Sequence, residues 1–296
     1  MDPVTFDRLR HLDLTVARRV EGLLQGDHRG LVPGPGQTPG EARPYEPGDD
    51  VRRIDWNVTA RTQRAHVRDT EADHELETTL VVDVSASMTF GTARGTKLDV
   101  ALAVAAVYGF ASLSGGNRVG AIVLGNDAVR IPARSGRAHL YAVLGAISEA
   151  EGAGGLDLAA GLAGAARTRS RRGLTVVISD FLDDGQWERP LRMLTHRHEV
   201  VAAVVSDPRE LSLPDVGVVR MEDPETGRQT WVDTASRRFR RAYARAASER
   251  QHDIERTIIR SGAHLLPLTT GHDWVADIVT WVLSRRTGAA ATGRTA

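Results

Sequence analysis

The pattern of apolar positions divides the central part of the chain into short continuous apolar runs and longer segments with helical spacing. Continuous runs rich in β-branched residues are typical of strands buried on both faces. The predicted strands are 78–83, 119–124, 128–131, 174–179, 200–205 and 264–268, and the predicted helices are 97–113, 138–149, 157–169, 186–195 and 274–285. This alternation predicts an α/β fold with a doubly wound, mostly parallel sheet and helices on both faces.

The segments before and after this region do not show the alternation of apolar runs and helical spacing. Apolar residues at helical spacing predict an amphipathic helix over 6–24, and the many glycines and prolines of 26–47 indicate a loop that crosses the surface. We therefore expect an N-terminal helix, loop and arm over 1–74, an α/β domain over 75–286 and a disordered tail over 287–296. Within the domain we expect a β-hairpin at about 216–232, followed by an arginine-rich helix over 236–260.

Composition narrows the range of functions. Lysines plus arginines and aspartates plus glutamates number 38 each, so no overall field marks the chain for nucleic acid or an anionic membrane. The absence of cysteine excludes disulfides and thiolate metal sites. The longest apolar stretch, 98–113, is shorter than the ~20 residues of a membrane span and predicts a core helix. The N-terminus lacks a secretory pattern, so we expect a cytoplasmic protein.

Acidic residues end two of the predicted strands. Asp83 is followed by Ser85 and Ser87, and Asp180 ends the strand 174–179. In open parallel sheets, ligands bind at the carboxyl ends of the strands. One carboxylate and two hydroxyls in a tight turn suit a hard divalent cation. In the alternative interpretation, Asp83 accepts hydrogen bonds from backbone amides of the loop, and the serines serve as turn and cap residues.

The sequence Asp83-x-Ser85-x-Ser87 resembles the metal-ion-dependent adhesion site of von Willebrand factor A domains. The resemblance implies a site for Mg²⁺ or Mn²⁺ that draws in a carboxylate from a protein partner, with Asp180 as a further ligand. It also implies a threonine ligand where this chain has Leu156, so the expected site is degenerate. Asp157 either replaces that ligand or caps the helix that follows it.

Residues 43–56, which read Arg-Pro-Tyr-Glu-Pro-Gly-Asp-Asp-Val-Arg-Arg-Ile-Asp-Trp, resemble a second signature. It is that of a bacterial family known as domain of unknown function 58, whose members carry a von Willebrand A-like domain. The resemblance implies a protein partner, namely a MoxR-type AAA+ ATPase or other von Willebrand A-like proteins. The implied role is a chaperone-like one in assembly, maturation or stress response.

The same arm mixes acids and arginines around one indole. Arginine can pair bidentately with a carboxylate, so the arm has the composition of an electrostatic clasp that holds it to the domain with Trp56 buried beneath it. Direct contact with a partner is the other interpretation. The candidate residues are Asp49, Asp50, Arg52, Arg53, Asp55, Trp56 and Arg61.

These features favour a nonenzymatic protein-interaction module. The first alternative is a magnesium-dependent phosphatase of haloacid dehalogenase type, which also has an aspartate at the end of its first strand. That chemistry uses a second acid two residues later, where this chain has Ser85. The second alternative is nucleic-acid binding through the basic helix segment 237–250, whose aromatic residues instead fit the apolar stripe of a helix that packs on the core.

Overall fold

The computed structural model describes residues 42–46, 54, 56–68, 76–92, 95–150, 157–167, 173–183, 186–222, 227–274, 276–278 and 281. The predicted helix at 6–24 and the predicted tail at 287–296 lie outside these ranges. Leu156 and five residues of the predicted clasp, Asp49, Asp50, Arg52, Arg53 and Asp55, also lie outside them.

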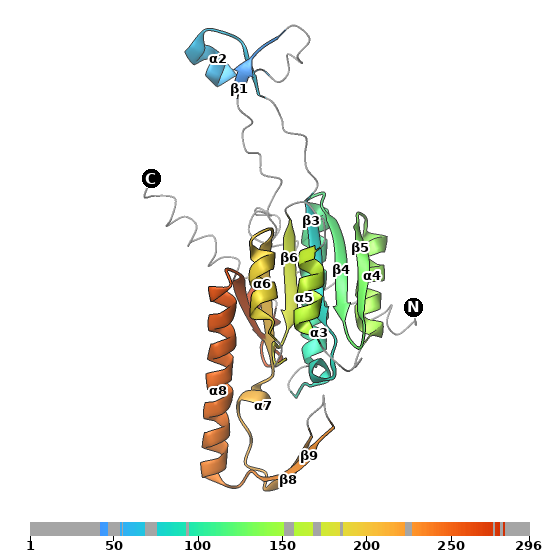
Figure 1. The fold of residues 1–296 in the computed structure, drawn as a ribbon, viewed down its shortest axis with the longest axis vertical. Helices are drawn as coiled ribbons and strands as arrows, with labels where there is room; N and C mark the ends of the chain where they lie inside the picture. The colour runs from blue at the N-terminus through green and yellow to red at the C-terminus, as the bar shows by residue number, and fades with distance from the viewer. Residues whose placement is uncertain are drawn as a thin grey trace.

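A six-stranded sheet forms the centre of the α/β domain (Figure 1). Its strands are β3 (Glu77–Asp83), β4 (Arg118–Leu124), β5 (Ala128–Arg134), β6 (Leu174–Ser179), β7 (Glu199–Ser206) and β10 (His264–Thr269). Their order is β10-β7-β6-β3-β4-β5, and only β5 pairs in the antiparallel direction. The chain reverses its direction of progress between β3 and β6, so the topological switch point lies between these two strands. The predicted doubly wound, mostly parallel sheet is confirmed.

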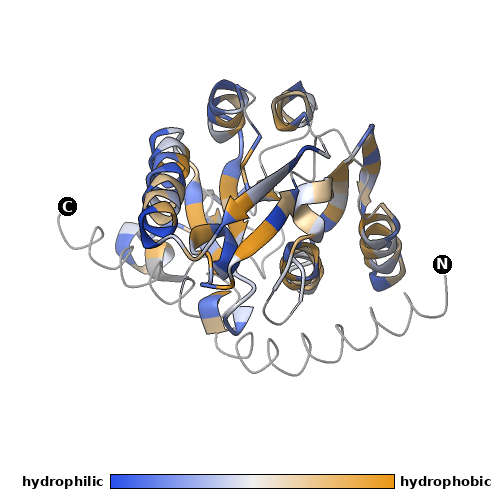
Figure 2. Cartoon of the chain, turned by 90° about the horizontal axis from the view of Figure 1, so that it is seen from below, coloured by the Kyte–Doolittle hydropathy of each residue, from blue (hydrophilic) through white to orange (hydrophobic). Residues whose placement is uncertain are grey.

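Helices cover both faces of the sheet (Figure 2). The helices of the domain are α3 (Lys97–Ser114), α4 (Arg137–Glu149), α5 (Leu158–Arg167), α6 (Glu188–Thr195) and α8 (Arg237–Arg260). On β3, Leu80 and Val82 face the core formed with α3 and α4, while Val81 faces the core formed with α5, α6 and α8. Because successive side chains of a strand point to opposite faces, the part of β3 between the two cores is apolar at consecutive positions.

Helix α3 has the length and apolar composition of a membrane span, with a mean hydropathy of 1.4 over 18 residues. In the fold it is a core helix, since 83% of that window is buried against the sheet. A capping box starts it: the Thr96 hydroxyl accepts from the Asp99 amide, and the Asp99 carboxylate accepts from the Thr96 amide. The predicted core helix at this position is confirmed.

The predicted hairpin consists of β8 (Val218–Glu222) and β9 (Gln229–Asp233), and the helix α8 follows it. Figure 1 shows the hairpin beyond the carboxyl ends of the strands, beside the first turns of α8. The apolar stripe of α8 is buried at Ile254 and Ile258, but Phe239 is 36% exposed. The prediction that Phe239 belongs to the core stripe is wrong, because this half of the helix extends past the sheet.

The arm before the domain contains elements that the apolar pattern does not predict. They are β1 (Ala42–Pro44), α2 (Trp56–Thr62) and β2 (His66–Arg68), with β1 and β2 antiparallel. Helix α2 directs Thr59 toward β2, where its hydroxyl accepts a hydrogen bond from the His66 amide. Trp56 is the first residue of this short helix and is 70% exposed. The predicted burial of Trp56 is therefore wrong.

Candidate functional site

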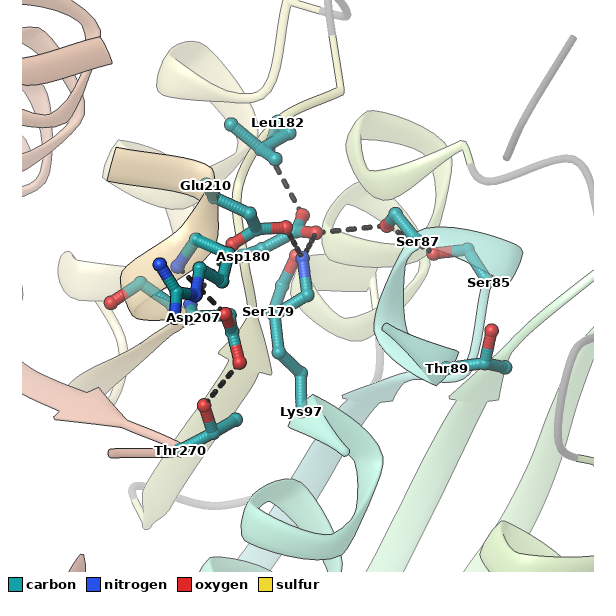
Figure 3. Close-up of polar contacts among 12 residues, drawn as sticks. Ser85, Ser87, Thr89, Lys97, Ser179, Asp180, Leu182, Asp207, Glu210 and Thr270 are labelled. Carbon is teal, nitrogen blue, oxygen red and sulfur yellow. Dashed lines mark hydrogen bonds and ion pairs between the residues drawn. The ribbon is translucent and has the colours of Figure 1, made fainter. Parts of the chain in front are cut away.

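The polar residues of the candidate site come from segments that meet at the switch point (Figure 3). The short helix η3 (Ala86–Thr89) follows β3, the helix α7 (Pro208–Leu211) follows β7, and the first turn of α3 lies between them. Asp180 comes directly after β6. The carboxyl ends of the parallel strands bring these segments together, as expected for this topology.

Asp83 is fully buried and both of its carboxylate oxygens accept hydrogen bonds. Oδ1 accepts from the Ser85 amide at 2.9 Å, and Oδ2 accepts from the Ser179 hydroxyl at 2.7 Å. The first contact is the one expected where Asp83 folds the loop onto its own backbone. The second joins the ends of β3 and β6 across the switch point.

The two serines of the loop lie beside Asp180. The Ser87 hydroxyl donates to Asp180 Oδ2 at 2.8 Å, and the Oγ atoms of Ser85 and Ser87 are 3.1 Å apart. The structure thus brings together four of the residues predicted as metal ligands, Asp83, Ser85, Ser87 and Asp180.

Lys97 enters the same cluster from the first turn of α3 (Figure 3). Its Nζ donates to Asp180 Oδ2 at 2.6 Å and to Glu210 Oε1 at 2.5 Å, and its side chain is 0% exposed. Burial alone lowers the pKa of Lys97, but the two carboxylates outweigh burial and raise it above 10.5. Lys97 is therefore a permanent buried cation. Burial also raises the pKa of Glu210, more than Lys97 lowers it.

The loop after Asp180 is held in a conformation that few side chains adopt. Phe181 has a φ of 57°, which costs a bulky residue about 1–3 kcal/mol. Packing offsets this cost, since the ring is buried edge-on against Trp187 with centroids 5.1 Å apart. The Leu182 amide donates to Asp180 Oδ1 at 3.0 Å. The strained turn thereby fixes the direction of the Asp180 carboxylate.

Asp207 anchors the neighbouring loops. It caps α7, and its carboxylate accepts from the Arg209 amide, from the Thr92 amide and hydroxyl, and from the Thr270 hydroxyl. Burial alone raises the pKa of Asp207, but these hydrogen bonds outweigh burial and lower it below its usual value. The Asp207 amide in turn donates to Glu210 Oε2, which orients the residue that binds Lys97.

Asp157 is not part of the cluster's hydrogen bonds that the structure describes. Its carboxylate accepts from the Ala160 amide at 2.7 Å, as a residue capping α5 does. Of the two roles expected for Asp157, metal ligand and helix cap, the structure shows the helix cap. Of the predicted clasp, the described residues are Trp56 and Arg61, which are both exposed.

The donor set at the switch point does not fit a divalent cation. Mg²⁺ requires near-octahedral oxygen ligands at ~2.0–2.1 Å, whereas Asp180 Oδ2 already binds the ammonium of Lys97 at 2.6 Å. The ammonium of Lys97 repels any second cation that approaches Asp180 Oδ2. Within the described ranges, histidines, aspartates and glutamates form no group of three or more that suits a metal.

Sequence reasoning missed Lys97, Glu210 and Asp207. Composition contains a signal for the first, because Lys97 is the single lysine among the 38 basic residues of the chain. The segment Asp207-Pro208-Arg209-Glu210 has the spacing of a capping box directly after a buried strand, which is a signal for the other two.

We expect Asp83 to make the fold more stable at mildly acidic pH. Burial, with the charge of Asp180 nearby, raises the pKa of Asp83 from 3.8 to about 6 despite its hydrogen bonds. A carboxyl with a higher pKa in the folded state takes up a proton on folding, so its contribution to the free energy of unfolding falls as the pH rises from 3.8 through about 6. Urea denaturation across this range measures the slope. The Asp83→Asn variant should lack this component, and an unchanged slope in the variant would contradict the assignment.

Comparison with known proteins places the chain in a family. An uncharacterized protein of Mycobacterium tuberculosis is 50% identical over 296 residues, which cover 98% of this chain and 92% of that protein, and one of Mycobacterium bovis has the same values. A third, of Mycobacterium avium, is 45% identical over 166 residues, covering 55% of this chain and 97% of that protein.

Two solved structures match most of the described domain at low sequence identity. The conserved hypothetical protein BatB from Bacteroides thetaiotaomicron is 16% identical with a TM-score of 0.44, and the match covers 72% of this chain and 99% of that one. An aerotolerance-related membrane protein from Bacteroides fragilis is 17% identical with a TM-score of 0.45, covering 71% and 97%. The sequence model of the family described as "Protein of unknown function DUF58" matches residues 41–253. The chain therefore belongs to the DUF58 family, as the signature in the arm predicts.

Proposed function

We propose that the chain is a nonenzymatic protein-interaction module that binds its partner at the carboxyl edge of the sheet, through the hairpin β8–β9. The observation that carries this proposal is the exposure of large apolar side chains on the hairpin. Trp231 is 71% exposed, Val218 is 63% exposed and Val216, just before the hairpin, is 60% exposed. Exposed apolar side chains gathered in one place mark interaction sites on soluble domains.

The pairing of the hairpin puts two of these side chains on one face. Val218 pairs with Asp233, and Arg220 pairs with Trp231. Directly paired residues, and residues two apart on one strand, share a face, so Val218, Arg220 and Trp231 lie on the same side. Tryptophan and arginine are the side chains most enriched among residues that dominate binding energy.

The resemblance of the arm to the DUF58 signature supports a MoxR-type AAA+ ATPase as the partner, with a role in assembly, maturation or stress response. The arm offers a second exposed indole, Trp56. We place the main contact on the hairpin because it lies beyond the carboxyl ends of the strands (Figure 1), the edge at which ligands of open α/β sheets bind.

The burial of Asp83 speaks against the phosphatase alternative. A nucleophilic carboxylate must reach phosphorus, but Asp83 is 0% exposed and each of its oxygens accepts a hydrogen bond. Turnover of p-nitrophenyl phosphate that is lost in the Asp83→Asn variant would overturn the nonenzymatic assignment.

Binding to a purified MoxR-type AAA+ ATPase tests the proposal. We expect the Trp231→Ala variant to bind the purified ATPase at least about 30-fold more weakly, the effect of losing about 2 kcal/mol at an interface. Trp231 is exposed, so the circular dichroism spectrum and the melting temperature should stay unchanged. Biolayer interferometry with the full chain measures the affinity.

Trp56→Ala is the matched control, because its indole is exposed to the same degree, 70% against 71%. We expect this variant to bind like the unchanged chain. Loss of binding in Trp56→Ala alone would move the interface to the arm, and no binding by the unchanged chain would refute the ATPase as partner.

A further inference from the structure

The ammonium of Lys97 lies against a residue that the sequence resemblance assigns to a metal ion. Its Nζ contacts Asp180 Oδ2, the same oxygen that accepts the hydrogen bond of Ser87, and it extends to Glu210 on the other side (Figure 3). Ser85 is one hydrogen bond further along this chain of contacts. One predicted metal ligand, Asp180, thus binds a side-chain cation directly, and Ser87 shares that carboxylate oxygen.

This position is unfavourable for a lysine in every local respect. Lys97 is the first residue of α3, where the helix dipole disfavours positive charge. Its side chain is 0% exposed, so the ammonium has also lost its hydration. Two carboxylates at hydrogen-bond distance compensate for both effects. Helix preferences therefore do not explain why a lysine stands at this position. Its ion pairs with Asp180 and Glu210 do.

The shape of the lysine side chain also suits a group that replaces a metal ion. The other basic residues of the chain are all arginines, and Lys97 is the one lysine. A guanidinium is planar and broad, whereas an ammonium is a compact charge with three donors around a single atom. Among side chains, the ammonium is thus the group that most closely replaces a small cation surrounded by oxygen atoms.

We propose that the ammonium of Lys97 takes the place of the divalent cation, so that the carboxyl edge keeps its arrangement without a metal. The carboxylates of Asp180 and Glu210 bind Lys97 instead of an ion, and the loops that carry Ser87, Asp180 and Glu210 are held together by a group that cannot dissociate. The replacement of the ion by Lys97 lies at the edge of the sheet to which we assign the partner. What it means for partner binding therefore rests on the proposed function. A complex with the ATPase should then be insensitive to EDTA.

Nuclear magnetic resonance tests the proposal on the unchanged full chain and needs no partner. Labelling with ¹⁵N-lysine gives one side-chain ammonium signal, because the chain has one lysine. We expect this signal to stay sharp when MnCl₂ is added, since no paramagnetic ion binds beside it. We also expect the melting temperature to stay within about 1 °C in excess MgCl₂ or EDTA. Broadening by MnCl₂ that the Asp180→Asn variant abolishes would overturn the proposal.

A variant supplies the converse test. Lys97→Ala removes the ammonium and leaves the two carboxylates with room for an ion, so its melting temperature should rise with MgCl₂ and calorimetry should detect Mg²⁺ binding. The double variant Lys97→Ala/Asp180→Asn is the control and should not respond. A folded Lys97→Ala chain that ignores MgCl₂ would refute replacement of an ion. If the Lys97→Ala variant does not fold, the response of the ¹⁵N-lysine signal of the unchanged chain to MnCl₂ still decides whether an ion binds beside Lys97. If the ATPase does not bind, the proposed partner is wrong, but both metal-binding tests remain valid because neither uses the ATPase.

Discussion

The Lys97→Met variant should lose about 3–5 kcal/mol of its free energy of unfolding at pH 7, the range measured when one partner of a buried ion pair is removed. Methionine keeps most of the volume of the lysine stem, so the loss comes from the charge rather than from a cavity. Without the ammonium, Asp180 retains only its hydrogen bonds from Ser87 and Leu182, and its buried charge is uncompensated. Urea denaturation followed by circular dichroism measures the loss.

A double-mutant cycle separates the ion pair from general damage to the loop. The Lys97→Met/Asp180→Asn chain should be more stable than the two single changes predict when added together, because the second change removes the charge that the first leaves unpaired. Additive effects would show that the two residues are not coupled and that the contact between them contributes little.

The second large effect is expected for Asp207→Ala, which should lose about 2–4 kcal/mol because several donors that point at one buried carboxylate lose their acceptor together. The Thr270 hydroxyl is buried and cannot replace Asp207 with water. The change also removes the cap of α7, so Glu210 loses part of its support. Because the pKa of Asp207 is lowered on folding, its stabilisation is present at neutral pH and is lost as the pH falls through the folded-state value.

Asp233→Ala is the matched control for Asp207→Ala. Asp233 also accepts a hydrogen bond from the amide two residues ahead, that of Ala235, but its side chain is exposed. Its replacement should cost less than about 1 kcal/mol. Equal losses in the two variants would mean that the local turn, and not the contacts with Thr92 and Thr270, carries the effect of Asp207.

The sequence predicts the fold well because this fold depends on local patterns. A strand buried on both faces has a continuous apolar run, as β3 has at Leu80, Val81 and Val82, and Asp83 marks the end of that run. The same logic places Asp180 beside Asp83, since both follow parallel strands at the switch point. The antiparallel direction of β5 follows from a different signal, the short link 125–127 after β4, because parallel neighbours need a much longer crossover.

The interior of the site is harder to predict, because its contacts join residues far apart in the chain. Lys97 has the position of an ordinary helix start, and Glu210 lies 113 residues away. Nothing in the spacing of either residue indicates that they meet. Trp56 shows the opposite error: an indole among charges suggests a buried anchor, but Trp56 at the start of α2 is exposed, and the contact of α2 with β2 that the structure describes is made by Thr59.

The two edge strands of the sheet limit how any partner can bind. Proline lacks the amide hydrogen that a neighbouring strand needs, and β5 contains Pro132 while β10 contains Pro267. β5 also presents Arg130 and Arg134, and charged side chains on an edge oppose the addition of a further strand. Recognition by backbone pairing along either edge is therefore disfavoured, as is self-association of the sheet into larger aggregates. A partner must instead recognise side chains, and these are presented at the end of the sheet rather than along its sides.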